Sequence, residues 1–378
     1  MMIAVAAIAL TAAAQQEIRR GTAQAAGPRV EKDGRVTFTL AAPTATAVTM
    51  QLDGSADLTL SRSGDVWTVT TPKALSPDVY RYLYVVDGVP VLDPSNVHTM
   101  RDVSTVKNLL IIDTPQRDLP LAVHDVPHGT VSAVWYNSPT LGRQRRMMVY
   151  TPAGYDSGRT RYPVLYLLHG SGGDETAWLE QGFVAQMLDN LIATGKVSPM
   201  IVVMPNGHTD TDAAPGADGR GLVAPSFDHK QWMEGSFEQS FGDIMAYVES
   251  HYRTRALKRG RAIAGLSMGG LHSLYISANR PADFGYVGLF SAAVMPRGGN
   301  TATVYQDLDG KLKALARQRP SLYWIGIGKD DFLYKENIGL REQLDNAKVR
   351  YTYVESDGGH EWRNWRAYLL QLLPLLFK

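Results

Sequence analysis

The chain contains no cysteine in its 378 residues. This absence excludes disulfide bonds, thiolate metal sites, cysteine nucleophiles and lipid attachment through cysteine. A large net charge is also missing, because 38 Lys and Arg side chains nearly balance 37 Asp and Glu, which leaves +1. No long-range field therefore favours nucleic acid or an anionic membrane. After the first residues no apolar run is long enough to span a bilayer. We therefore expect neither a nucleic-acid partner nor a membrane span.

The chain begins with an apolar stretch, residues 3–10, that is typical of the core of a secretory signal peptide. Small residues at 11–14 suit cleavage, and polar Gln15 and Gln16 follow. The positive charges that usually precede such a core are missing, and a truncated start of the sequence would explain their absence. We predict a signal peptide over residues 1–14 and a secreted or periplasmic location. The alternative is an alanine-rich tail.

Residues 25–113 have the pattern of a small all-β domain. Apolar and polar residues alternate over 36–40 and 66–70, and Asp87-Gly88 is typical of a hairpin turn. Several short strands separated by turns indicate an immunoglobulin-like sandwich. Its aromatic side chains could stack on sugar rings or form the core, and alternation alone fits both roles; they are Trp67, Tyr80, Tyr82 and Tyr84. Residues 114–129, which include prolines and charges, are predicted to be a linker.

The remainder, residues 130–378, alternates apolar strands with longer helical segments. An antiparallel pair is expected over 130–135 and 146–150. This order predicts an α/β fold with a mostly parallel sheet covered by helices. The further strands are expected at 164–168, 200–204, 262–264, 286–290, 322–327 and 349–354.

A candidate nucleophile lies in Gly265-Leu266-Ser267-Met268-Gly269. Gly-x-Ser-x-Gly forms a tight turn that raises a serine above the sheet of an α/β-hydrolase, provided that a strand precedes it and a helix follows. Both are predicted here, and the two glycines remove side chains that would clash in such a turn. With 35 glycines in the chain a bare match would mean little, so the flanking elements carry the prediction that Ser267 is the nucleophile.

The glycine-rich loop His169-Gly170-Ser171-Gly172-Gly173 follows the strand expected at 164–168. In hydrolases this loop supplies one backbone N–H of the oxyanion hole, and the residue after the nucleophile supplies the other. We therefore expect Met268 as one donor and Ser171 or Gly172 as the second, with Ser171 favoured.

A general base and an acid that orients it should follow the serine in the chain. His360 comes after the strand expected at 349–354 and is the best-placed histidine, whereas His169 is expected to pack beneath the glycine-rich loop. Asp330 and Asp331 both lie in the loop after the strand expected at 322–327. Loop position does not choose between these two aspartates.

Residues 130–378 resemble carbohydrate esterase family 1, the esterase-D-like hydrolases that include feruloyl and acetylxylan esterases. The preceding module resembles early-set domains and family 48 carbohydrate-binding modules through Tyr82-x-Tyr84-x-x-Asp87-Gly88 and Asp93-Pro94-x-Asn96. The family's Gly-x-x-Asp pattern implies Asp331 as the acid. The matching esterase segments are Leu167-Leu168-His169-Gly170-x-Gly172-Gly173, Pro205-Asn206-Gly207, Phe241-x-Asp243-Ile244, His251-Tyr252-Arg253, Gly265-Leu266-Ser267-Met268-Gly269-Gly270, Gly328-x-x-Asp331 and Gly359-His360-x-Trp362.

The substrate pocket is less well predicted. The polar segment 207–232 follows a strand, and we expect it at the rim of the site. Trp178, Trp232 and Trp362 are the candidate aromatic contacts, and Trp362 is favoured because it lies two residues from His360. No cofactor or metal is needed for hydrolysis by a serine, a histidine and an aspartate.

The resemblance implies a secreted serine esterase that removes feruloyl or acetyl groups from plant cell-wall xylan. Its partner would be an ester-bearing polysaccharide or oligosaccharide. One alternative keeps the chemistry but acts on a siderophore of the enterochelin type. A second is a non-catalytic carbohydrate-binding protein on a hydrolase fold.

Overall fold

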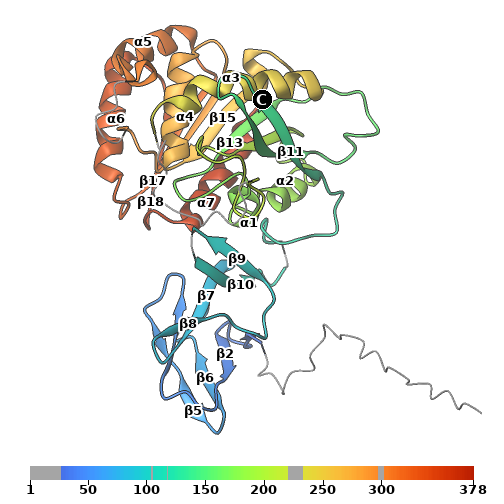
Figure 1. Ribbon diagram of the computed structural model, residues 1–378, viewed down its shortest axis with the longest axis vertical. Coiled ribbons are helices and arrows are strands. Elements are labelled where there is room, and N and C mark those ends of the chain that lie inside the picture. The colour runs from blue at the N-terminus through green and yellow to red at the C-terminus, as the bar shows by residue number, and fades with distance from the viewer. Residues whose placement is uncertain (1–26, 104, 117, 220–232, 297–301) are drawn as a thin grey trace, which may run out of the picture. The chain divides into compact units, whose positions relative to one another are not determined.

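The computed structural model describes residues 27–103, 105–116, 118–219, 233–296 and 302–378 (Figure 1). The predicted signal peptide therefore lies outside the described residues. None of the described helices is long and apolar enough to cross a membrane. By compactness the chain divides into two units. The smaller comprises the described residues up to Leu75 together with Leu83–Val97, and the larger comprises Ser76–Tyr82 and His98–Lys378.

The smaller unit is built from short antiparallel strands, which is compatible with the predicted sandwich. Trp67 and Tyr84 are buried in it. The indole of Trp67 donates to the Ala42 carbonyl at 3.0 Å, and the Tyr84 hydroxyl donates to the Thr39 carbonyl at 3.0 Å. Both rings therefore pack in the core. One sheet has the order β1 (Arg29–Val30), β2 (Val36–Ala41), β6 (Val66–Thr70), β5 (Ser61–Ser63); β3 (Val48–Leu52) pairs with β4 (Leu58–Thr59), and the end of β7 (Asp78–Val86) pairs with β8 (Val89–Val91).

The first half of β7 belongs to the larger unit. It pairs with β10 (Thr105–Ile112), which pairs in turn with β9 (Thr99–Asp102). Asp78 accepts hydrogen bonds from Arg363 at 2.8 Å and Arg366 at 2.9 Å. The predicted module boundary at residue 113 and the division by compactness therefore do not coincide, because these charge pairs tie β7 and its partners to the esterase region.

The larger unit contains an eight-stranded sheet in the order β11-β12-β14-β13-β15-β16-β17-β18. β11, β12 and β14 pair antiparallel, and all pairs from β14 to β18 are parallel. All the strands predicted for this region are present with small shifts at their ends. Their bounds are β11 Thr130–Ser138, β12 Arg143–Thr151, β13 Val164–Leu168, β14 Ile201–Pro205, β15 Arg261–Leu266, β16 Tyr286–Phe290, β17 Leu322–Gly328 and β18 Thr352–Ser356.

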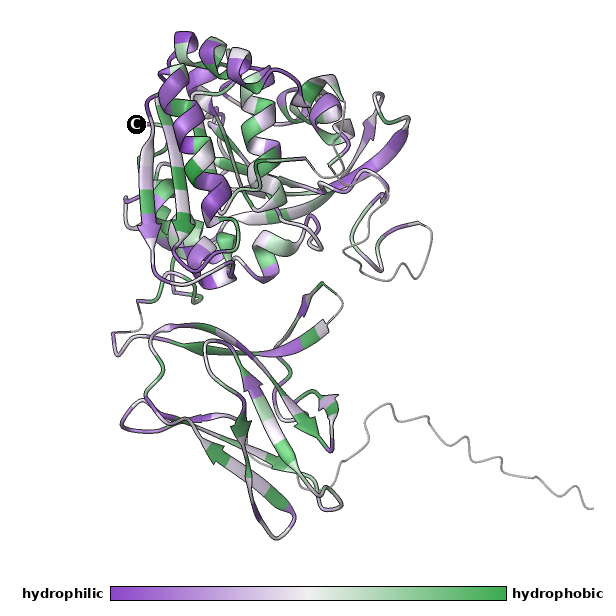
Figure 2. Ribbon diagram, turned by 90° about the vertical axis from the view of Figure 1, so that its left-hand side faces the viewer, coloured by the Kyte–Doolittle hydropathy of each residue, from purple (hydrophilic) through white to green (hydrophobic). Residues whose placement is uncertain are grey.

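Helices cover both faces of this sheet (Figures 1 and 2). Strand side chains alternate between the faces, so Tyr166 and Leu168 join one buried cluster and Leu165 and Leu167 the other. The first cluster includes residues of α3, α4, α5 and α6, and the second includes residues of α1, α2 and α7. The helices are α1 Ala177–Glu180, α2 Val184–Ala193, α3 Ser236–His251, α4 Met268–Asn279, α5 Leu308–Gln318, α6 Tyr334–Ala347 and α7 Trp362–Leu372.

The fold positions the predicted site residues at one edge of the sheet. β13, β15, β17 and β18 run parallel, and their carboxyl ends lead into the loops that carry the glycine-rich segment, Ser267, Asp331 and His360. In open α/β sheets this edge is where ligands bind.

Candidate active site

Ser267 occupies a strained turn between β15 and α4. Its φ of 53° and ψ of −114° are unusual for a residue with a side chain, and such a conformation costs about 1–3 kcal/mol. The turn is held by hydrogen bonds from the Ser267 N–H to the Phe290 carbonyl at 2.9 Å and from Ala293 to the Ser267 carbonyl at 3.1 Å. A Cβ at Gly265 would lie 2.4 Å from the Gly269 carbonyl oxygen. Glycine is therefore required for this tight turn.

His360 is paired with Asp331. Its Nδ1 lies 3.0 Å from both carboxylate oxygens. The Leu333 N–H also donates to this carboxylate, at 2.9 Å. Burial opposes ionisation of Asp331, but the hydrogen bond from His360 and its other partners outweigh that cost and hold the pKa of Asp331 below its ordinary value of 3.8. Asp330 is exposed, and the structure brings Asp331 to the imidazole instead.

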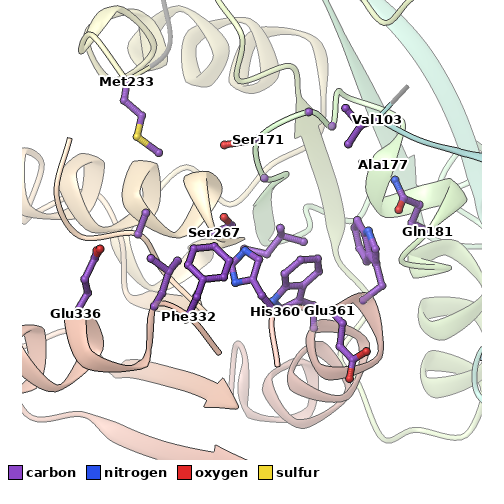
Figure 3. Close-up of a pocket in the computed structure, with 18 of the residues that line it drawn as sticks. Val103, Ser171, Ala177, Gln181, Met233, Ser267, Phe332, Glu336, His360 and Glu361 are labelled. Carbon is purple, nitrogen blue, oxygen red and sulfur yellow. The ribbon is translucent and has the colours of Figure 1, made fainter. Parts of the chain in front are cut away.

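Ser267 and His360 line one cavity of about 740 Å³ (Figure 3). Residues Gly170 to Gly173 line the same cavity. A Cβ at Gly170 would lie 2.5 Å from a Leu266 methyl and 3.2 Å from the Ser267 Cβ, so the glycine-rich loop passes directly against the turn that carries the serine. Met268, the first residue of α4, is buried beside it. Ser171 and Gly172 both line the cavity, and the choice between them as the second donor stays a prediction.

His169 holds the glycine-rich loop. It is buried, its Nδ1 lies 2.7 Å from the Gly170 carbonyl, and its Nε2 accepts from the Gly207 N–H at 2.7 Å. The two bonds require the tautomer with a proton on Nδ1. Both ring nitrogens therefore form hydrogen bonds within the fold, and His169 has a structural role.

A buried carboxylate fixes the described part of the predicted rim segment. Glu175 accepts from Arg146 at 2.6 Å, Asn206 at 3.0 Å and the Ala214 N–H at 2.9 Å. This network joins the end of the glycine-rich loop to residues 206–214. In the part of the chain that the structure describes, no three His, Asp or Glu side chains gather as a metal site would require.

The three predicted tryptophan contacts have different outcomes. Trp362 lines the cavity. Trp178 is 1% exposed, donates from its indole to the Leu168 carbonyl at 2.9 Å, and packs edge-on against Trp362 with ring centroids 5.1 Å apart. Its predicted substrate contact is wrong, because the residue is fully buried in the core. Trp232 lies outside the described residues.

Sequence reasoning missed most of the side chains that line the cavity, and three of them matter for the site. Phe332 and Trp365 flank the imidazole of His360 with ring centroids at 4.4 and 4.9 Å. Trp365 is three residues after Trp362 on α7, a spacing that places both on one helix face and could have revealed it. Gln181 also lines the cavity, and no motif marks it.

The chain is similar to known esterases in sequence. A family model described as "Putative esterase" matches residues 138–376. A relative from Xylanibacter ruminicola named endo-1,4-beta-xylanase/feruloyl esterase is 32% identical over 361 residues, which cover 93% of this chain and 46% of the relative. The chain thus spans about half the length of that relative.

Two solved structures extend the comparison. A carbohydrate esterase family 1 ferulic acid esterase from Anaeromyces mucronatus is 25% identical, with a TM-score of 0.55 over 75% of this chain and 97% of that one. The enterobactin esterase of Shigella flexneri is 21% identical, with a TM-score of 0.66 over 93% of this chain and 96% of that one; this likeness concerns the fold. The chain therefore belongs to the esterase family, and its larger unit has the α/β-hydrolase fold.

Proposed function

We propose that the protein is a secreted serine esterase that removes feruloyl groups, or acetyl groups, from plant cell-wall xylan. The observation that carries the chemistry is a serine on a strained strand-to-helix turn that shares a cavity with a histidine paired to a buried aspartate. The name of the Xylanibacter ruminicola relative and the ferulic acid esterase from Anaeromyces mucronatus support the feruloyl ester as substrate. The apolar pattern of residues 3–10 supports export.

In the proposed mechanism the Ser267 Oγ attacks the ester carbonyl carbon while His360 Nε2 takes its proton. Asp331 keeps the other ring proton on Nδ1 and stabilises the imidazolium that forms. The N–H groups of Met268 and Ser171 donate to the oxyanion of the tetrahedral intermediate. The bond between the carbonyl carbon and the sugar oxygen then breaks, His360 gives its proton to that oxygen so that it leaves as a hydroxyl, and the acyl group stays on Ser267. Water, deprotonated by His360, releases the free acid and regenerates the serine.

The two ends of the cavity differ in enclosure. Figure 3 shows Met233 and Glu336 at one end, Ala177 and Gln181 at the other, and Ser267 between them. Ala177 and Gln181 are 3% and 6% exposed and so enclose their end on both sides, whereas at the other end Met233 is 5% exposed but Glu336 is exposed. The acyl group is the terminal part of the substrate. On the other side of the ester bond the polysaccharide continues, and it must be able to extend out of the cavity. We therefore place the acyl group at the enclosed end near Gln181.

Substitution Gln181→Leu should reduce the preference for an acyl group whose aromatic ring carries oxygen substituents. Gln181 supplies an amide at the enclosed end, and a lost hydrogen bond of about 1.5 kcal/mol corresponds to a roughly tenfold fall in kcat/KM. We expect that fall for methyl ferulate and little change for methyl cinnamate, whose aromatic ring carries no oxygen substituent. The control is Gln186→Leu, on α2 and outside the lining. Equal falls for both esters would indicate a structural role for Gln181.

A substrate panel tests the proposed function itself. Purified protein is assayed on methyl ferulate, acetylated xylan and a catechol-siderophore ester, and we expect turnover of the feruloyl or acetyl ester to exceed that of the siderophore by at least tenfold. The siderophore is included because the enterobactin esterase shares the fold over 93% of this chain. Preferential hydrolysis of the siderophore would replace the proposed substrate.

We also propose an assignment of domains along the chain. Residues 25–113 would form an early-set module of the family 48 type, residues 114–129 a linker, and residues 130–378 the hydrolase. Antiparallel pairing throughout the smaller unit supports the first assignment, and the family match over 138–376 supports the last.

A further inference from the structure

A basic surface lies on the larger unit away from the candidate active site. Two hollows of about 1000 and 330 Å³ adjoin there, because Arg319 and Ser321 line both. We call them together the basic groove. Its lining includes seven cationic side chains and no Asp or Glu; the cations are Lys258, Arg259, Lys313, Arg317, Arg319, Lys348 and Arg350.

The cations come from three separate segments. Lys313 and Arg317 are four residues apart on α5 and share a helix face. Arg319 and Lys348 are the C-caps of α5 and α6, and both have left-handed backbone with φ of 49° and 62°. These four side chains, Arg259 and Arg350 are exposed, whereas Lys258 is partly buried and donates to the Gln318 carbonyl. Among the described residues none of the seven has a carboxylate within ion-pair distance.

Helix dipoles explain only part of this concentration of charge. α5 and α6 both end at the groove, and cations near helix C-termini are favourable. Each terminus carries the equivalent of roughly half a negative charge, so the two helices offset about one of the seven cations. The excess positive charge is unusual in a chain whose net charge is +1.

The groove is separate from the cavity that contains Ser267. Leu322 and Thr352, the first residues of β17 and β18, line the groove, whereas Asp331 and His360 follow the carboxyl ends of these strands. At about 3.3 Å per residue the seven residues of β17 span roughly 23 Å. A bound ligand in the groove would therefore not touch the reacting ester.

We propose that the basic groove binds the uronate carboxylates of an acidic polysaccharide, an inference that rests on the proposed function. Exposed cations hold a single carboxylate weakly. A polymer that carries several carboxylates can contact several of them at once, and each further contact gains from the high effective concentration. Tyr351 packs partly against the core and is partly exposed in the lining, which adds an aromatic side chain beside the cations. The groove would hold the chain of an acidic xylan while the cavity takes an ester from it.

The test compares two triple variants of the full chain. Arg317→Gln/Lys348→Gln/Arg350→Gln removes charge from the groove, and Lys32→Gln/Arg159→Gln/Lys196→Gln removes the same charge from exposed sites elsewhere. Binding is measured by affinity electrophoresis with native glucuronoxylan and with glucuronoxylan whose carboxyl groups have been reduced to alcohols. Thermal denaturation confirms that both variants are folded, and methyl ferulate hydrolysis is assayed in parallel.

We expect the unmodified protein to bind native glucuronoxylan at least tenfold more tightly than the reduced polymer at low salt, and 200 mM NaCl to weaken that binding. The groove variant should lose at least tenfold in affinity, the control variant less than twofold, and both should hydrolyse methyl ferulate normally.

Equal binding of native and reduced polymer, or equal losses in the two variants, would overturn the proposal. Tighter binding of duplex DNA than of glucuronoxylan would also overturn it. Binding as expected without hydrolysis of methyl ferulate would reject the feruloyl substrate and leave the groove assignment intact.

Discussion

Substitution Ser267→Ala is expected to lower kcat/KM for ester hydrolysis by a factor of about 10⁴ to 10⁶. Ser267 is the group that forms the acyl-enzyme, so its loss leaves only the oxyanion hole and substrate binding to assist attack by water. KM should change little, since the small hydroxyl contributes mainly to the transition state. The measurement is steady-state hydrolysis of methyl ferulate by the purified variant.

A matched serine and a covalent label make this result specific. Ser250, exposed at the end of α3, is replaced by alanine as the control and should leave activity unchanged. A fluorophosphonate should label the unmodified protein and Ser250→Ala but not Ser267→Ala. Labelling of Ser267→Ala at the same rate, or wild-type hydrolysis by it, would contradict the assignment of the nucleophile. Failure of the unmodified protein to react at all would favour the non-catalytic carbohydrate-binding protein.

Substitution Asp331→Asn should lower kcat/KM by about 10³ to 10⁴. The amide can donate to Nδ1, which places the ring proton on Nε2, so the nitrogen that should accept the Ser267 proton is already protonated. Asp330→Asn is the matched control because Asp330 is the adjacent exposed carboxylate, and it should retain activity within about twofold. Loss of activity in Asp330→Asn with retention in Asp331→Asn would reverse the assignment.

The lowered pKa of Asp331 predicts how the stability of the protein depends on pH. Its pKa lies below the ordinary value of 3.8, so the unfolded state takes up this proton at a higher pH than the folded state, and the ionised carboxylate stabilises the fold. That contribution is complete above about pH 5 and is lost as the pH falls through 3.8 and below. The free energy of unfolding, measured by urea denaturation, should therefore fall more steeply from about pH 5 to about pH 3 in the unmodified protein than in Asp331→Asn. Parallel curves for the two proteins would contradict the lowered pKa.

The nucleophile turn could be predicted because its chemistry is local. A buried strand, two glycines and a buried helix within one short segment determine the conformation of Ser267, and a Cβ at Gly265 or Gly269 would clash with backbone. The roles of His360 and Asp331 depend on contact between residues 29 positions apart. Chain order and the family resemblance supplied that pairing, and the structure gives the distance of 3.0 Å.

The lining of the cavity was harder to predict. Trp178 and Trp362 are both aromatic residues next to site loops, yet one is buried in the core and the other lines the cavity. Their difference depends on the packing of α1 against α7, which composition does not encode. Gln181 was missed because a single polar residue at the C-cap of a short helix has no periodic pattern.

By itself the sequence determined the order of strands and helices, the turn at Ser267 and the family, because each depends on neighbours along the chain. Only the tertiary structure decided which side chains share a surface. A net charge of +1 predicts no attraction for polyanions, but the ends of α5 and α6 and the segment before β15 meet at one edge of the fold and gather seven cations there. The net charge of a chain does not say where its charges lie, because only folding brings cations from separate segments to one surface.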